Sequence, residues 1–128
     1  MPRYSYEIGS DLEEMTNIET LCGVPARGLA IEPYSVYRVA ADGTEYGDGY
    51  PWTEWHFDVI EQAGLDALLA FLDTAQSASV YIRTTNQAGD YAYYSAVMHR
   101  PKRENMEPRF VERWANVVIR FTMLELQP

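Results

Sequence analysis

Three potential metal ligands occupy alternate positions in one segment of the chain. Glu54, His56 and Asp58 alternate with Trp55 and Phe57, and in a β-strand this period of two places the two sets on opposite faces. Histidine and carboxylate side chains bind zinc and other transition metals. Three ligands along one straight strand cannot converge on a single ion without a bend in the backbone. We therefore expect the polar row to face solvent or a neighbouring molecule and to bind no metal.

The other reactive side chains lack the neighbours that catalysis needs. Cys22 is the only cysteine, and it could act as a nucleophile only if the fold brought one of the two histidines beside it. Because Gly23 follows it, we expect a small buried apolar residue instead. The segment Asp42–Gly49 has the composition of a calcium-binding loop, but it lacks the alternating ligands and the final Glu. The sequence predicts a non-enzymatic protein without catalytic residues, metal or cofactor.

The composition is typical of one globular domain of 128 residues. Apolar residues make up 47% of the chain, and no apolar run approaches the roughly 20 residues of a membrane-spanning helix. A lone cysteine cannot form an internal disulfide and fits a reducing compartment. We expect a single domain over residues 1–128, with an arm or short helix in residues 1–30 and a β-structure in residues 31–128.

The charge is strongly acidic and unevenly distributed. The net charge of −9 argues against free nucleic acid or an anionic membrane as a partner. Residues 1–75 contain 14 acidic and three basic side chains, whereas residues 76–128 contain five acidic and seven basic ones. If subunits associate, the basic half of one and the acidic half of its neighbour are complementary, and such complementarity sets register more than affinity.

Arginine supplies nine of the ten basic residues, and ten residues are tyrosine. Both residue types are enriched at protein–protein interfaces. The arginine excess is equally typical of the codon bias of a GC-rich genome, and the tyrosines are also compatible with a carbohydrate-binding face or a polar monomer surface. Tyr91, Tyr93 and Tyr94 place tyrosine on both faces of a predicted strand, which one buried face does not explain. We therefore favour a surface that another protein covers.

Periodicity predicts one helix and several strands. Four leucines recur at i, i+3, i+4 and i+7 in Glu61–Asp73, which indicates a helix with one apolar stripe: Leu65, Leu68, Leu69 and Leu72. Alternating or β-branched residues predict strands at 34–40, around Trp55, and at 79–85, 91–98 and 116–126. In two of these strands we expect the following residues to face the core: Trp55, Phe57 and Val59, and Val117, Ile119, Phe121 and Met123.

The remaining segments are predicted as irregular, apart from one short N-terminal helix. Ser10 and Glu13 fit a capping box that starts a helix over residues 12–21, and Gly23 would end it. Residues 41–51 and 100–113 are rich in Gly, Asp, Pro or charge, and we expect loops there. The predicted fold is mainly β: an antiparallel β-sandwich or partly rolled barrel, with one short α-helix (about 61–73) packed on it and an N-terminal arm.

The order of these elements resembles the tail-tube fold of long-tailed bacteriophages, which is shared by tube subunits, distal-tail proteins and tail-completion proteins. The resemblance covers about residues 34–126. It rests on a Gly/Asp-rich loop leading into the aromatic strand Trp52–Phe57, the Leu-rich helix within Gly64–Leu72, the Tyr/Arg hairpin Val80–Met98 and the strand Val117–Thr122. The N-terminal arm has no counterpart in it.

The resemblance implies a virion structural protein, made in the cytoplasm of the bacterial host and assembled into the tail. Its partners would be copies of itself, in rings or stacked rings, and other tail proteins. DNA would pass through the central channel without specific binding, and no membrane would be involved. The resemblance assigns contacts between subunits to the two predicted loops, with these residues: Asp42, Glu45, Tyr46, Asp48, Tyr50, Arg100, Lys102, Arg103, Arg109 and Arg113.

Two other interpretations of the sequence stay open. A monomeric binding module could use the tyrosine-rich surface for a carbohydrate or peptide. A small enzyme could use His56 and Asp58 with neighbouring acidic groups. The first interpretation predicts homo-oligomers, the second a monomer that responds to ligand, and the third an activity that depends on His56.

Overall fold

The computed structural model describes residues 6–24, 26–28, 31–101, 107–108 and 113–127. Its fold is mainly β, with two short helices, α1 (Ile18–Cys22) and α2 (Gln62–Leu69). The main-sheet strands are β1 (Glu7–Gly9), β2 (Thr16–Asn17), β3 (Arg27–Gly28), β6 (Trp52–Glu61), β7 (Ser77–Thr85), β8 (Tyr91–His99), β9 (Glu107–Pro108) and β10 (Arg113–Leu126). Two further strands, β4 (Val36–Val39) and β5 (Glu45–Asp48), form a separate small sheet.

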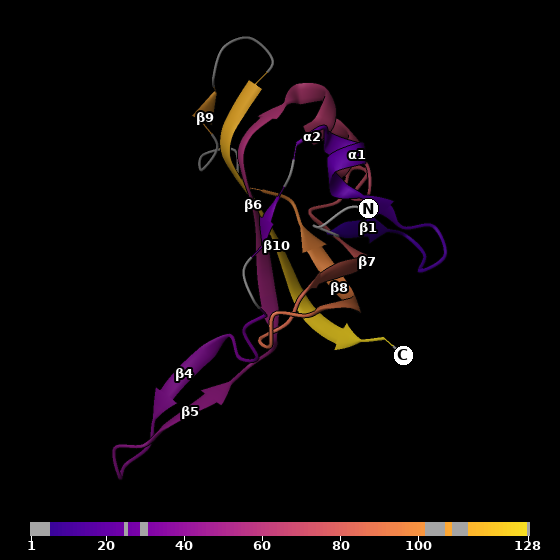
Figure 1. Ribbon diagram of the computed structural model, residues 1–128. Helices are drawn as coiled ribbons and strands as arrows, with labels where there is room; N and C mark the ends of the chain where they lie inside the picture. The colour runs from indigo at the N-terminus through magenta and orange to yellow at the C-terminus, as the bar shows by residue number, and fades with distance from the viewer. Residues whose placement is uncertain (1–5, 25, 29–30, 102–106, 109–112, 128) are drawn as a thin grey trace.

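The main sheet is antiparallel and curled, with the strand order β2-β1-β7-β8-β10-β6-β3 (Figure 1). Its curl brings β6 and β7 together across the inner face, although β8 and β10 separate them in the sheet. There the indole Nε1 of Trp55 donates a hydrogen bond to Thr84 Oγ1 at 3.1 Å, and the Trp55 and Phe121 rings lie 4.6 Å apart. The prediction of a mainly β, partly rolled antiparallel sheet with a short packed helix is confirmed.

The core fills the inner face of this sheet, and the helices lie beside it. Leu65 and Leu68 of α2 and the following Leu72 are buried, whereas Leu69 is only half-buried. The helix ends at Leu69 and not at Asp73, because the chain continues in tighter turns in which Leu72 N–H donates to Leu69 C=O. The predicted leucine stripe is therefore correct, and the predicted helix is four residues too long at its end.

The N-terminal helix is shorter than predicted and begins elsewhere. The Asn17 side chain, not Ser10, caps α1 by accepting a hydrogen bond from Glu19 N–H at 2.9 Å. Near the predicted capping box, Asp11 instead organises a turn between β1 and β2, accepting from Glu13 N–H at 3.2 Å. The expected helix end at Gly23 is correct, with φ 77. The N-terminal segment contributes β1 to the main sheet through its pairing with β7.

Two predicted core positions are exposed because strand alternation fails locally. Val59 is 45% exposed, and Ile60 is buried in its place. Val59 pairs with Ala115 of β10, and the next residue of that strand, Asn116, has a positive φ of 57. Met123 is 58% exposed, and Leu124 takes the buried position. The register between β10 and β8 shifts between Thr122 and Glu125, which is the signature of a β-bulge.

The conformation of Met123 gives a stability prediction. Its φ of 56 is left-handed, which is unfavourable for a residue with a Cβ. We expect Met123→Gly to raise the free energy of unfolding by about 0.5–1 kcal/mol, because glycine removes this strain. Urea titrations of the two proteins measure the change. Met123→Ala, which keeps the Cβ, should give no gain, and a lower stability for the glycine variant would contradict the bulge interpretation.

Candidate interaction surface

A β-hairpin formed by β4 and β5 projects from the body of the molecule (Figure 1). The predicted strand over residues 34–40 is confirmed, but the segment predicted as a loop contains β5. The register pairs Val36 with Asp48 and Val39 with Glu45. Gly43 has φ 89 in the connecting turn, and Asp42 accepts hydrogen bonds there from Thr44 N–H at 3.0 Å and Thr44 Oγ1 at 2.6 Å. These bonds hold the pKa of the Asp42 carboxyl below its usual value.

The hairpin exposes large apolar side chains. All four residues of β4 are exposed, and Tyr37, Val39 and Tyr46 are 56%, 66% and 50% exposed. Tyr37 and Val39 lie on one face of the hairpin, whereas Tyr46, which pairs with Arg38, lies on the other face. Single exposed apolar residues are normal, but neighbouring exposed apolar residues such as Tyr37 and Val39 are typical of an interaction site. A two-stranded hairpin is also only marginally stable in water. The hairpin is therefore the part of the described surface that most needs a partner.

One side of the hairpin carries an ordered group of side chains, which we call the aromatic face: Tyr34, Tyr37 and Val39. The Tyr34 and Tyr37 rings meet edge to face at 6.1 Å. The Tyr34 ring lies against Gly47, where a Cβ would collide with it. Tyr37 Oη donates a hydrogen bond to Glu32 Oε2 at 3.2 Å. Contacts within the chain thus fix both rings before any partner arrives, which lowers the entropic cost of binding.

The root of the hairpin is fastened to the main sheet. Glu32 and Trp52 exchange two backbone hydrogen bonds of 2.9 Å, and Trp52 Nε1 donates to Tyr34 C=O at 3.1 Å. On the second arm, Tyr50 N–H donates to Ser35 Oγ at 3.3 Å. The hairpin therefore leaves the body in a defined direction.

Gly47 offers a test of the aromatic face. We expect Gly47→Val to displace the Tyr34 ring and to weaken any association through this face, while the core stays folded. The melting temperature and the molar mass in solution measure the two effects. Gly43→Asn is the matched control, because asparagine tolerates a positive φ and no atom lies within 4 Å of the added Cβ. If Gly47→Val and Gly43→Asn associate equally well, the aromatic face is not part of the interface.

The ten residues predicted to contact neighbouring subunits occupy two separate places. Asp42, Glu45, Tyr46, Asp48 and Tyr50 lie together on the hairpin or at its root. Arg113 lies opposite Glu61 at the other end of β6, a strand of ten residues that spans about 30 Å. Arg100 lies beside α2 and the turns that follow it. Lys102, Arg103 and Arg109 lie outside the described residues.

The two described arginines of the second group are engaged within the chain. Arg100 donates to Asp73 C=O at 2.8 Å and to Ala75 C=O at 3.1 Å, which ties the end of β8 to the turns after α2. Arg113 lies 3.7 Å from Glu61. Arg38 on the hairpin likewise contacts Asp48 at 3.1 Å.

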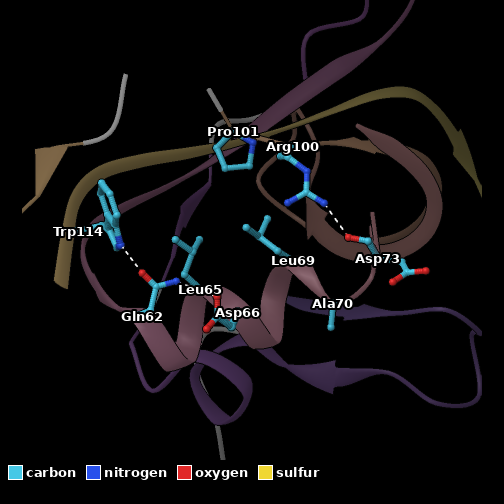
Figure 2. Close-up of a pocket in the computed structure, with 9 residues that line it drawn as sticks. All are labelled: Gln62, Leu65, Asp66, Leu69, Ala70, Asp73, Arg100, Pro101 and Trp114. Atoms are coloured by element: carbon cyan, nitrogen blue, oxygen red, sulfur yellow. Dashed lines mark hydrogen bonds between the residues drawn. The ribbon is translucent and has the colours of Figure 1, made fainter. Parts of the chain in front are cut away.

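A pocket of about 390 Å³ lies beside Arg100, between α2 and the start of β10 (Figure 2). Its polar side chains bind one another: Trp114 Nε1 donates to Gln62 Oε1 at 2.6 Å, and Gln62 Nε2 donates to Asp66 Oδ1 at 2.7 Å. Leu65 and Leu69 form part of the wall. Sequence reasoning missed this pocket because its residues come from three distant segments and form no motif.

Two of the potential metal ligands on β6 lie beside each other, with His56 Nε2 3.6 Å from Glu54 Oε1, whereas Asp58 contacts Arg27 at 2.6 Å. Among the residues that the structure describes, no three His, Cys, Asp or Glu side chains are grouped to hold a metal ion. Neither described helix is long and apolar enough to cross a membrane.

Cys22 is buried, as expected, and burial raises the pKa of its thiol to about 11. Since the thiolate is the reactive form, the native thiol should be nearly inert at pH 8. We expect alkylation by iodoacetamide to be at least about a hundredfold slower in the native protein than in urea. Mass spectrometry of timed samples measures this ratio. Similar rates in the two states would mean that Cys22 is accessible.

Comparison of the chain with protein-family models, curated proteins and solved structures finds no significant match in any of the three.

Proposed function

We propose that this protein is a non-enzymatic structural subunit that self-associates through its projecting hairpin, and that the assembly is a ring of a bacteriophage tail. The ring would belong to the tail tube or to a component at its end, and it would surround the path of the DNA. One observation carries the proposal: the hairpin exposes an ordered aromatic face that the described part of the chain leaves largely uncovered.

The position of the hairpin supports association between different regions of two subunits. The hairpin leaves the main sheet at the start of β6, whereas α2 follows the end of that strand. The fastened root also keeps the hairpin away from its own body. A protruding element that binds a different region of the next copy makes a heterologous contact, and such contacts generate rings or stacked arrays.

The curled antiparallel sheet and its short packed helix are compatible with the proposed resemblance to tail-tube proteins. The net charge of −9 is compatible with a conduit, because an acidic protein does not retain DNA by charge attraction. Both points support the proposal without identifying the position in the tail.

Light scattering on the size-exclusion peak, with negative-stain images of the same fractions, tests the proposal. We expect particles of several subunits with a central hole. A variant in which a short Gly-Ser turn replaces residues 35–49 should keep the melting transition of the body and stay monomeric. A wild-type protein that stays a monomer at every concentration would favour the tyrosine-rich binding module instead. Solid particles without a hole would contradict the conduit.

A further inference from the structure

The pocket beside α2, which we call the Arg100 pocket, contains a positive charge that the described part of the chain does not neutralise. The Arg100 guanidinium donates to the backbone C=O of Asp73 (Figure 2) and to that of Ala75. Each of the other described arginines lies within 4 Å of a carboxylate, whereas no described carboxylate lies that close to Arg100. Because a guanidinium has five N–H donors, Arg100 can still bind a carboxylate from another molecule.

The wall of the Arg100 pocket is partly apolar. Leu69 of α2 lies across the pocket from Pro101 and Arg100 (Figure 2). The Asp66 carboxylate also lines it, but it already accepts a hydrogen bond from Gln62 Nε2 at 2.7 Å. The volume of about 390 Å³ lies within the roughly 300–1,000 Å³ of pockets that bury a ligand. The pocket therefore suits an apolar group that carries a carboxylate.

The aromatic face of the hairpin and the adjacent Glu45 have this chemistry. Glu45 pairs with Val39, and directly paired residues of two strands point to the same side of a sheet. The Glu45 carboxylate therefore lies beside Val39, on the side of the hairpin that carries Tyr37. Glu45 is exposed, and it forms no ion pair with any described residue. The hairpin thus complements the Arg100 pocket both in apolar surface and in charge.

A chain cannot place its own hairpin in its own Arg100 pocket. The hairpin precedes the start of β6, and the pocket lies beside α2, which follows the end of this strand about 30 Å away. The fastened root of the hairpin also directs it away from the body (Figure 1). The hairpin that fits this pocket therefore belongs to a second copy, and the contact is heterologous.

We propose that the Arg100 pocket receives the aromatic face of a second copy, and that Glu45 of this copy pairs with Arg100. Tyr37 and Val39 would then lie against the apolar wall that Leu69 helps to form. The inference rests on the proposed self-association through the hairpin, to which it adds the receiving site. It requires neither a ring nor a channel.

Light scattering over a range of concentrations tests this contact by exchanging its two charges. We expect Glu45→Lys and Arg100→Glu each to weaken association at least about tenfold, because each brings like charges together. The double variant Glu45→Lys/Arg100→Glu restores the pair in reverse order, and it should associate within about threefold of wild type. Glu13→Lys is the matched control, because it changes an exposed carboxylate in the turn between β1 and β2 by the same charge. It should associate like wild type.

Thermal melts show whether each variant folds, since Arg100 also ties the end of β8 to the turns after α2. If Arg100→Glu does not fold, Arg100→Gln replaces it, because an amide can still donate to the backbone carbonyls. Arg100→Gln and Glu45→Gln then form a double-mutant cycle. Since both substitutions break the same pair, the double variant should lose no more affinity than either single variant.

Three results would overturn the inference: no recovery in a folded charge-exchanged variant, additive losses in the double-mutant cycle, or equal losses for Glu45→Lys and Glu13→Lys. A wild-type protein that stays a monomer at every concentration would overturn it together with the proposed function. Rings that form equally well in all these variants would refute only the receiving site. Recovery of association in particles without a central hole would refute only the proposed ring.

Discussion

Replacing Tyr37 and Val39 by serine is expected to abolish self-association and to leave the body of the protein folded. Both side chains belong to the aromatic face, and both are more than half exposed in the single chain. Aromatic anchors at the centre of an interface each contribute about 2 kcal/mol or more to binding. Loss of the Tyr37 anchor, about 2 kcal/mol, weakens association about thirtyfold, and loss of the apolar surface of Val39 weakens it further.

Light scattering over a range of concentrations measures this loss, and thermal melts monitor the fold. Leu12→Ser is the matched control, because Leu12 is also an exposed apolar residue but lies far from the hairpin in the sequence. We expect the control to assemble like wild type. If the hairpin variant assembles as well as the control, the aromatic face does not form the contact.

Replacing Trp55 by alanine is expected to have the largest effect on stability. Its side chain is fully buried, packs against Phe121 and Tyr6, and donates to Thr84 across the curled sheet. Removal of a buried aromatic side chain costs about 3–5 kcal/mol, which is a large part of the 5–15 kcal/mol that usually stabilises a domain. Urea unfolding should show a much lower midpoint, or a protein that is unfolded in buffer.

Two control variants show how much of the lost unfolding free energy comes from the hydrogen bond of Trp55 and how much from its burial. Trp55→Phe keeps a buried ring but leaves Thr84 without its indole donor, and we expect a smaller loss of unfolding free energy. Val59→Ala changes an exposed residue on the same strand and should stay within about 0.5 kcal/mol of wild type. A loss below 1 kcal/mol for Trp55→Ala would contradict the placement of this ring at the centre of the core.

The regular elements could be predicted because local pattern and burial agree in them. The leucine stripe of α2, the alternation of β7 and that of β8 from Ala96 onward follow from one buried face per element. Prediction failed where an irregular backbone at one residue changes which side chains of a strand point toward the core. The spacing in β10 predicts that Met123 is a core residue, but a left-handed backbone at that position turns its side chain outward. No residue type in β10 marks this bulge in advance.

The candidate surface was predicted in part. The resemblance assigned residues of 42–50 to contacts between subunits, but Gly47 was interpreted as a turn residue. The structure places it inside β5, where it provides room for the Tyr34 ring. Arg100 was predicted to contact neighbouring subunits, yet two backbone carbonyls of its own chain bind it. Such long-range contacts depend on how the segments meet in three dimensions, which no local spacing encodes.

Hydrogen–deuterium exchange of the hairpin amides, compared between concentrated and dilute protein, tests most directly whether the hairpin is the contact between subunits. In the dilute monomer, β4 and β5 should exchange rapidly, because an isolated two-stranded hairpin is only marginally stable. In the assembly, we expect the amides of residues 36–39 and 45–48 to be at least about tenfold more protected, while residues 80–84 in the core stay unchanged. Assembled particles in which the hairpin exchanges as rapidly as in the monomer would contradict the account.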